Sequence, residues 1–334
     1  MSRTARAFWS TGPGAGELRE EPLPVPGVSD VEVTAEFSAI SRGTEALVLA
    51  GAVPPSQHDV MRAPYQSGEF PFPVKYGYLS VGTVTAAGGR VPELLGRRVF
   101  CPHPHQDRYV VPASAVLAVP AAVPAPRAVL AGMMETAVNG VWDAQVGVGD
   151  RVSVVGAGVL GMLVAALASR VPGTDVELVE VRADRARVAA AMGARLAAPD
   201  DARRGRDVVL HTSGTGAGLS TGLALLGDEG VLTELSWYGD RPVEVHLGEG
   251  FHSRRLAVRA SQVGRVPPSR APRWTPRRRL ALAMQLLDDA AFDVLLDGES
   301  AFEDAADVVP AVAGPGGAAL CHRLRYAAAD APAS

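Results

Sequence analysis

The sequence contains only two cysteines, Cys101 and Cys321, in 334 residues. Two cysteines so far apart exclude a disulfide framework and a structural zinc lobe of four cysteines, so we expect both thiols to be reduced. The N-terminus also lacks the apolar segment of a secretory signal. These two absences predict a cytoplasmic protein.

Arginine carries almost all of the positive charge. The net charge is −4, Lys75 is the only lysine, and no basic run is long enough to follow a phosphate backbone, so we expect no nucleic-acid partner. Residues 152–169 are uncharged, but three glycines in the first ten positions and a strand-like start argue against a membrane-spanning helix. We therefore expect no membrane association either.

A glycine turn organises the chain between Arg151 and Arg185. The β-branched run 152–155 predicts a strand, the turn follows, and an alanine-rich helical pattern continues from it. This order is typical of a dinucleotide site, in which glycines allow the turn and the helix start meets a pyrophosphate. An ordinary glycine-rich turn is the alternative. The expected cofactor contacts in the turn are Gly156, Gly158, Val159, Leu160 and Gly161.

A carboxylate ends the next predicted strand. Residues 176–179 form an apolar run that ends in Glu180, near the spacing of about 20 residues at which an acid meets the ribose 2′-hydroxyl of NAD. An acid at this place repels a 2′-phosphate. The predicted cofactor is therefore NAD(H) rather than NADP(H).

Strand and helix patterns alternate after Glu180, whereas the residues before 120 are rich in strand patterns. Further strands are predicted at 207–211, 230–236 and 255–261, with helices between them. Such alternation predicts an α/β protein with a doubly wound parallel sheet. A short strand is expected near Val294 and a disordered tail from residue 327.

The chain resembles the medium-chain dehydrogenase/reductase superfamily, and most closely its branch of bacteriochlorophyllide side-chain dehydrogenases and uncharacterised "zinc-binding dehydrogenases". The matching segments are Gly43-Thr44-Glu45, Gly77-Tyr78-Leu79 with Val81-Gly82, the glycine turn, and Glu180 with Arg185. The resemblance implies a GroES-like β-barrel catalytic domain (1–120 and 263–334) and a Rossmann domain (121–262). It also implies a homodimer paired through the sheet edge near 237–245.

Two zinc-ligand positions of that family hold other residues here. Arg42 stands at the cysteine position and Tyr78 at the histidine position, so only Glu135 matches a ligand. One carboxylate does not make a catalytic zinc site. His103 and His105 form a pair that could bind a metal. Two histidines on such a loop are more often surface or hydrogen-bonded residues. We expect no metal.

Without zinc, the oxygen of a reacting carbonyl needs hydrogen-bond donors and a proton from the protein. Tyr78 is the expected donor, with the Lys75 ammonium lowering its pKa. Each residue also has a purely structural interpretation: Tyr78 as a packed core tyrosine and Lys75 as a surface lysine. Glu45, Glu135 and His103 are the further catalytic candidates, although Glu135 is equally suited to an ion pair at a helix end.

The resemblance implies further contacts to the cofactor. Asn139, the only asparagine, matches the position next to the nicotinamide, and His252 and Arg254 are weaker candidates. The other expected contacts are Arg185, Ser213, Ser236 and Trp237.

Three functions remain open. The first is an NAD(H)-dependent, zinc-independent oxidoreductase that interconverts a secondary alcohol and a ketone, for example on a ring or sugar-like small molecule. The second is a catalytically silent NAD(H)-binding sensor or scaffold. The third is a quinone or enone reductase, which would usually prefer NADP and is therefore opposed by Glu180. Retention of titratable groups beside the expected cleft favours the first.

Overall fold

The computed structural model describes residues 3–327, which fall into two compact units. Unit 1 comprises the residues before 133 and those after 295, and unit 2 comprises residues 133–295. The sequence-based boundaries differ, since 121–132 belong to unit 1 and 263–295 to unit 2. The tail residues 328–334 lie outside the described part.

Helix α7 (Pro276–Leu286) explains the second difference in boundaries. Its buried Arg279 donates to the Glu135 side chain of helix α3 (Ala131–Ala144), with Nε and Oε1 3.1 Å apart. The Trp142 and Trp274 rings, 4.7 Å apart, add an apolar contact between α3 and the segment before α7. The proline- and arginine-rich segment is therefore bound to unit 2.

Unit 1 is built on two sheets. The smaller sheet has the strand order β2-β1-β5-β4, and the larger has the order β16-β17-β3-β6-β7-β9 with β8 also paired to β3. Within these sheets only β16 and β17 pair in parallel. The strands are β1 (Thr4–Gly12), β2 (Ala15–Pro22), β3 (Asp30–Ala39), β4 (Ser67–Gly68), β5 (Val74–Lys75), β6 (Ser80–Ala87), β7 (Arg98–Cys101), β8 (Arg108–Pro112), β9 (Leu117–Ala118), β16 (Gly298–Ala301) and β17 (His322–Arg325).

Alternating apolar residues explain the larger sheet of unit 1. Val31 and Val33 of β3 are fully buried and share a core cluster with Val84, Val99 and Tyr109. Short helices complete the unit: α1 (Arg42–Leu49), η1 (Pro55–Gln57), η2 (Pro92–Leu94), η3 (Ala113–Ala115), α2 (Ala125–Ala128), η8 (Phe302–Asp304) and α8 (Ala305–Ala313).

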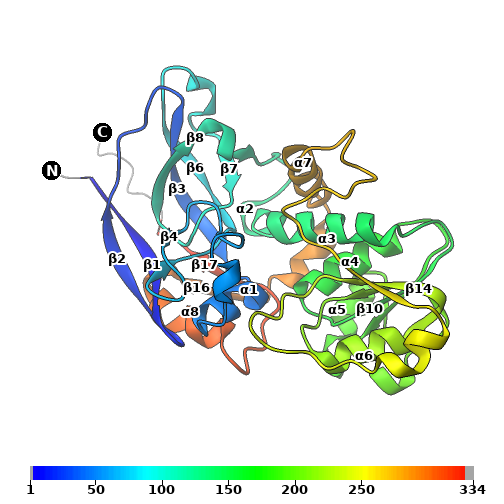
Figure 1. Ribbon diagram of the computed structural model, residues 1–334. Helices are drawn as coiled ribbons and strands as arrows, with labels where there is room; N and C mark the ends of the chain where they lie inside the picture. Colours follow the sequence, from blue (N-terminus) through cyan, green and yellow to red (C-terminus); the bar gives the residue numbers. More distant parts are fainter. Residues whose placement is uncertain (1–2, 328–334) are drawn as a thin grey trace. The chain divides into compact units, whose positions relative to one another are not determined.

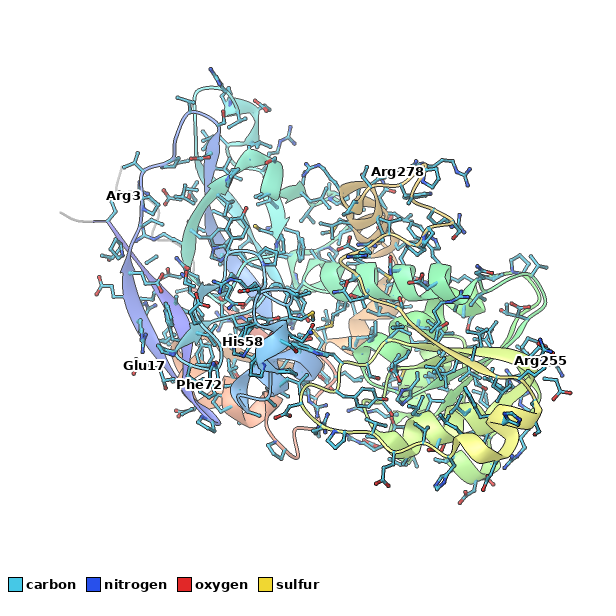
Figure 2. The ribbon with its side chains drawn as sticks, in the orientation of Figure 1. Arg3, Glu17, His58, Phe72, Arg255 and Arg278 are labelled. Carbon is cyan, nitrogen blue, oxygen red and sulfur yellow. The ribbon has the colours of Figure 1, made fainter. Side chains whose placement is uncertain are left out.

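The proline-rich segment between α1 and β5 has little regular structure. His58 and Phe72, both labelled in Figure 2, lie on this segment. The His58 ring packs on Phe70 with ring centroids 5.5 Å apart, and its Nε2 is 3.1 Å from the Val53 carbonyl oxygen. The loop is thus held by local contacts.

Unit 2 is a six-stranded parallel sheet with the order β12-β11-β10-β13-β14-β15, and helices cover both of its faces (Figure 1). The order reverses between β10 and β13, and a ligand binds such a sheet at the carboxyl ends of the strands around that point. The elements are β10 (Arg151–Val155), α4 (Val159–Ser169), β11 (Asp175–Val179), η4 (Ala183–Arg185), α5 (Ala186–Ala191), β12 (Arg195–Ala197), η5 (Pro199–Asp201), β13 (Arg206–His211), α6 (Gly216–Leu225), β14 (Leu226–Glu234), η6 (Leu247–Phe251), β15 (Ala257–Ala260), α7 and η7 (Ala290–Leu295).

The β-rich unit and the doubly wound parallel sheet predicted from the sequence are both confirmed. Two local expectations are wrong. The residues around Val294 form a 3-10 helix, because Phe292 and Leu295 both point into the core. Residues 237–245 form no strand, and β15 is the edge strand on that side of the sheet. Within residues 3–327, no helix combines the length and apolar character needed to cross a bilayer.

Candidate functional site

The glycine turn of unit 2 has the geometry of a dinucleotide cradle. Gly156 has a φ of +104°, which a side chain would strain, and a Cβ at Gly161 would lie 1.9 Å from the Gly156 carbonyl oxygen. A Cβ at Gly158 would meet no protein atom within 4 Å. No packing contact therefore requires glycine at 158, and the space beside it is open in front of α4.

Glu180 lies at the carboxyl end of β11 and reaches back to this turn. Its Oε2 accepts a hydrogen bond from the Ala157 N–H at 2.8 Å, and its Oε1 accepts from the N–H groups of Val181 and Arg182 at 2.8 and 3.1 Å. Three backbone donors thus fix the carboxylate beside the turn, at the place where a ribose would be bound.

The carboxyl ends of β13 and β14 are joined by a polar network. The ring nitrogens of fully buried His211 lie 2.7 Å from Glu234 Oε2 and 2.6 Å from Ser213 Oγ. The Tyr238 hydroxyl donates to Glu234 Oε2 at 2.9 Å. Hydrogen bonds from His211 and Ser236 lower the pKa of Glu234 despite its burial, so this carboxylate is ionised.

The same network fixes two of the expected cofactor contacts. Ser213 Oγ packs under α6, because a Cβ at Gly218 would lie 2.1 Å from it. Ser236 Oγ accepts from the Gly214 N–H at 3.0 Å. Ser213 and Ser236 therefore hold the loops at the ligand edge of the sheet. Trp237 is half-buried next to Ser236, and Arg185 is 7% exposed at the end of η4.

Asn139 does not have the environment expected of a cofactor contact. It is 1% exposed, its Oδ1 accepts from Arg279, and its Nδ2 lies 3.0 Å from Asp143 Oδ2 and 3.3 Å from Ser261 Oγ. All of its amide groups are thus occupied within unit 2. The only asparagine of the chain joins α3 to α7 and to the loop after β15.

Glu135 takes the role of an ion-pair partner at the helix. Its Oε1 is 3.1 Å from Arg279 Nε, and the Arg279 guanidinium also donates to the carbonyl groups of Val263 and Arg265. Burial raises the pKa of Glu135, while Arg279 opposes that shift. The carboxylate is held by this arginine, which corrects its place among the catalytic candidates.

In unit 1, Tyr78 lies beside the start of α1. Its hydroxyl donates to Ser41 Oγ at 2.6 Å and is 3.3 Å from Thr44 Oγ1. Burial, and to a smaller extent the Glu45 carboxylate, raise the Tyr78 pKa, while the two hydrogen bonds act against that rise. The phenol therefore stays protonated around neutral pH and can act as a donor.

The expected pairing of Lys75 with Tyr78 is wrong. The ammonium of Lys75 donates to Glu21 Oε2 at 2.6 Å and to Gln106 Oε1 at 2.9 Å, and the residue is 6% exposed. Lys75 thus joins β5 to β2 and to the loop before β8. The Tyr78 pKa is raised, whereas an adjacent ammonium would lower it.

His103 is also unsuited to proton transfer. Its ring stacks on Tyr109 at 3.8 Å and on Tyr65 at 5.4 Å, and its Nδ1 is 3.1 Å from the Pro104 carbonyl oxygen. Burial lowers the His103 pKa to about 3, so the ring is neutral and packed as an aromatic group.

A buried polar chain, which sequence reasoning missed, surrounds Glu45. His105 Nε2 lies 3.0 Å from Glu45 Oε2, and His105 Nδ1 lies 2.7 Å from Ser38 Oγ, which is 2.8 Å from the Tyr326 hydroxyl. Glu45 Oε1 also accepts from the Ser41 N–H at 2.7 Å. Glu45 therefore joins this chain to the backbone at the start of α1, next to the hydroxyl cluster formed by Ser41, Thr44 and Tyr78.

Local sequence gives little sign of this chain, because its members are separated by 60, 67 and 288 positions. The contact between His211 and Glu234, in contrast, could have been predicted from the sequence. These residues end neighbouring parallel strands in register, so their side chains meet at one edge of the sheet.

The residues at the positions that the resemblance assigns to zinc ligands do not fit a catalytic zinc. The Arg42 guanidinium donates to the Ala319 carbonyl at 2.9 Å, and the Tyr78 hydroxyl keeps its proton. Zinc needs about three thiolate, imidazole or carboxylate ligands. Across residues 3–327 the structure brings together no group of three or more His, Cys, Asp or Glu side chains placed to hold a metal ion.

The chain is similar to known dehydrogenases in part of its sequence and in its fold. No protein-family model matches the chain. D-Guloside 3-dehydrogenase from Escherichia coli is 27% identical over 185 residues, which are 52% of this chain and 51% of that enzyme, so the match spans about half the length of this relative.

Two solved structures cover nearly all of the chain. A Sinorhizobium meliloti protein assigned as a zinc-binding dehydrogenase, bound to NADP, superposes with a TM-score of 0.77 at 20% identity over 97% of this chain and 99% of that one. An E. coli alcohol dehydrogenase in complex with NADH superposes with a TM-score of 0.75 at 16% identity over 96% and 99%. The resemblance drawn from the sequence is confirmed at the level of the fold: the chain has the GroES-like and Rossmann architecture of the medium-chain dehydrogenases/reductases.

Proposed function

We propose that this protein is an NAD(H)-dependent, zinc-independent oxidoreductase that interconverts a secondary alcohol and a ketone on a sugar-like small molecule. The observation that carries the proposal is the glycine turn with open space at Gly158. A glycine that no protein atom requires is explained by a ligand that would clash with a side chain.

The residues of the turn fit a dinucleotide. The N-terminus of α4 supplies backbone N–H groups and the positive end of a helix dipole for a pyrophosphate. The Glu180 carboxylate keeps accepting capacity for ribose hydroxyls, because two oxygens share three backbone donors. When bound, the nicotinamide supplies or accepts the hydride.

The preference for NAD(H) over NADP(H) rests on Glu180. The same fold holds NADP in one solved neighbour and NADH in another, so the fold does not decide the matter. A fixed carboxylate beside the ribose repels a 2′-phosphate, and this favours NAD(H).

The hydroxyl cluster of unit 1 takes the place of a metal in the proposed chemistry. Reduction of a ketone places negative charge on oxygen, and an aimed hydroxyl donor stabilises that charge. Tyr78 is half-buried and keeps its proton, so it is the proposed donor to the substrate oxygen. Its proton turns from Ser41 Oγ to the substrate, and the Ser41 and Thr44 hydroxyls then donate to the phenol oxygen and hold it in place.

The class of substrate is proposed from the curated relative. That relative is named a D-guloside 3-dehydrogenase, and its name specifies a ring position of a sugar derivative. A sugar-like secondary alcohol also suits a site of hydroxyl groups, which can donate and accept hydrogen bonds.

Binding and turnover should be measured together. We expect NADH to bind with enhanced fluorescence and to bind more tightly than NADPH, and we expect NAD+ reduction with a member of a panel of glycosides and polyols. Protein freed of metal by chelation should keep full activity. Turnover that requires added zinc would refute the metal-free assignment.

The other two functions correspond to distinct results. Tight NADH binding without turnover on any alcohol or carbonyl would indicate a sensor or scaffold. NADPH-dependent reduction of quinones or enones, with no activity on alcohols, would indicate a quinone or enone reductase.

A further inference from the structure

The polar chain around Glu45 runs through the interior of unit 1 without a break. It consists of Tyr326, Ser38, His105 and Glu45, joined by distances of 2.8, 2.7 and 3.0 Å between the bonded atoms. Ser38, His105, Glu45 and Tyr326 are 0%, 1%, 4% and 5% exposed. Four polar side chains are thus buried one after another. The proposed chemistry involves only the surroundings of Glu45.

The hydrogen bonds are compatible with one continuous direction along the chain. The Gln106 N–H donates to the Tyr326 hydroxyl oxygen, and the phenol proton is available for Ser38 Oγ. Ser38 can then donate to His105 Nδ1, and the Nε2–H of His105 donates to the Glu45 carboxylate. In this arrangement every proton in the chain points toward Glu45.

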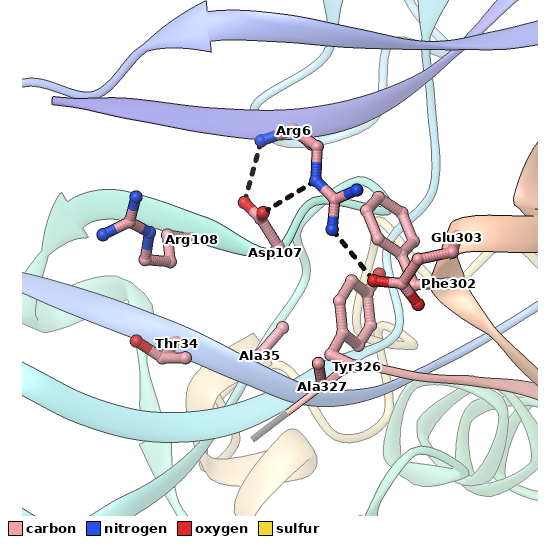
Figure 3. A pocket seen from close by; sticks show the side chains of 9 residues that line it. All are labelled: Arg6, Thr34, Ala35, Asp107, Arg108, Phe302, Glu303, Tyr326 and Ala327. Atoms are coloured by element: carbon pink, nitrogen blue, oxygen red, sulfur yellow. Dashed lines mark hydrogen bonds and ion pairs between the residues drawn. The ribbon is translucent and has the colours of Figure 1, made fainter. Parts of the chain in front are cut away.

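The outer end of the chain borders a cavity of about 340 Å³ (Figure 3). Tyr326 lines this cavity together with Arg6, Asp107 and Glu303. The side chains of Arg6 and Glu303 are 46% and 43% exposed and are paired across 2.9 Å, so the cavity reaches the surface of unit 1. Charged groups at its wall favour water in this space.

We propose that Tyr326, Ser38 and His105 form a proton relay that carries protons from this cavity to Glu45, beside the Tyr78 hydroxyl. The proposal rests on the proposed function and deepens it, since it names the route by which a metal-free site is supplied with protons. His105, Ser38 and Tyr326 act through Glu45 and are positioning residues.

The proton balance follows from the direction of the chain. Each ketone reduced takes up one hydride at carbon and one proton at oxygen. As Glu45 gains a proton from His105 Nε2, His105 Nδ1 takes the Ser38 proton, Ser38 takes the Tyr326 proton, and Tyr326 takes one from cavity water. Tyr78 gives its proton to the substrate oxygen and regains one from Glu45 through an intervening water, since Glu45 contacts Ser41 only at its backbone N–H. Rotation of the His105 ring restores the starting tautomer, and the net change is one proton moved inward.

Other titratable groups face this chain. Tyr76 and Tyr78 lie near Glu45, and the Glu45 charge raises the pKa of each in addition to the larger effect of burial. Cys321 also lies near Glu45, and burial raises its pKa to about 12. Asp107 faces Tyr326, and His103 faces His105. A pH profile of the relay therefore includes contributions from these groups.

A second buried pair offers a matched control. Tyr109 and Ser80 are 2% and 1% exposed, and their hydroxyl oxygens lie 3.0 Å apart. Loss of the Tyr109 hydroxyl removes a buried bond between tyrosine and serine, just as loss of the Tyr326 hydroxyl does, but leaves the chain to Glu45 intact.

The first test needs no turnover. Histidine ¹⁵N spectra of the resting protein, with His105 assigned by its loss in His105→Gln, should show Nε2 protonated and Nδ1 as an acceptor. Ser38→Ala should shift the Nδ1 resonance, while Tyr109→Phe should leave it in place. A protonated Nδ1 in the wild type would overturn the relay whether or not the protein is an oxidoreductase.

The second test uses the proposed reaction. Tyr326→Phe should lower the rate of carbonyl reduction about tenfold, raise the solvent deuterium isotope effect and reduce the isotope effect of deuterated NADH, because proton supply becomes limiting. Tyr109→Phe should keep both isotope effects. Equal isotope effects in the two folded variants would overturn the relay, whereas a wild type without turnover would refute the proposed function alone.

Discussion

A phenol stands at position 78, where the resemblance to zinc-dependent dehydrogenases implies a metal ligand. Its buried environment raises its pKa, so it does not ionise readily. Tyr78→Phe removes only the hydroxyl. We expect carbonyl reduction to fall roughly 10²- to 10⁴-fold, the range for loss of a general acid, with NADH affinity nearly unchanged. Single-turnover kinetics and fluorescence titration measure the two quantities. Near-native turnover would assign the donor to another group.

The raised pKa of Tyr78 also predicts a pH profile. The protonated phenol is the active form in the reduction direction, and a raised pKa moves its loss to more alkaline pH. The reduction rate should therefore show no decline caused by Tyr78 between about pH 6 and 9. A decline in this range that is absent from Tyr78→Phe would contradict the assigned direction of the shift.

At position 180 the charge of one side chain sets the cofactor preference. Glu180→Gln keeps the shape of the side chain and removes the repulsion of a 2′-phosphate. We expect the ratio of NADPH to NADH affinity to rise roughly tenfold, or about 1.4 kcal/mol. Asp207→Asn, at the amino end of β13, removes a carboxylate paired with Arg151 and should leave the ratio unchanged. Calorimetric titration of both variants decides the matter.

His103 makes the stability of the protein depend on pH. Burial lowers its pKa from 6.5 to about 3, so between these values the unfolded chain binds more protons than the folded one. Stability must then fall as pH decreases below about 6.5, by up to about 1.4 kcal/mol per pH unit. His103→Phe should flatten this dependence in urea unfolding at pH 4 to 7, whereas exposed His246→Gln should not. An unchanged slope in His103→Phe would contradict the neutral buried ring.

At the scale of elements, two glycines of the turn have different roles: Gly161 is required for packing, and Gly158 is expected to be required for cofactor binding. Gly161→Ala places a Cβ 1.9 Å from a backbone oxygen and should lower the thermal unfolding midpoint by several degrees. Gly158→Ala meets open space and should keep the wild-type midpoint while NADH binding is lost. Calorimetry and NADH titration of the pair provide the check. Retained NADH binding in Gly158→Ala would show that the open space is not the cofactor site.

The same turn shows why part of the site was predictable. Its glycines, the following helix and Glu180 lie within one local segment, so their spacing was enough to predict the strand, the turn and the carboxylate beside it. The chain from Glu45 to Tyr326 depends on pairings such as β17 with β3, which local pattern does not specify. Lys75 and Asn139 were singled out for being unique in the sequence, yet rarity does not reveal partners, and both proved to be buried structural links.

At the scale of the whole molecule, the edge of the Rossmann sheet predicts self-association. The residues of β15 are all exposed, and the outer side of this strand has no partner within residues 3–327. An open edge of this kind is a template for pairing with another strand, and we propose a homodimer through β15 instead of residues 237–245. Val258→Lys should produce a monomer in light scattering, while Val181→Lys, at a more exposed valine, should not. A monomeric wild type at micromolar concentration would remove this proposal.

Unit 1 is built from the two ends of the chain, and this affects the order in which its strands can pair during synthesis. Strand β17 must insert beside β3, whose residues leave the ribosome almost three hundred residues earlier. Unit 2 is continuous in sequence and can finish folding on the nascent chain, whereas the larger sheet of unit 1 keeps an unpaired edge until the last strand arrives. Tyr326 enters with that strand, so the step that closes the sheet of unit 1 is also the step that completes the chain to Glu45.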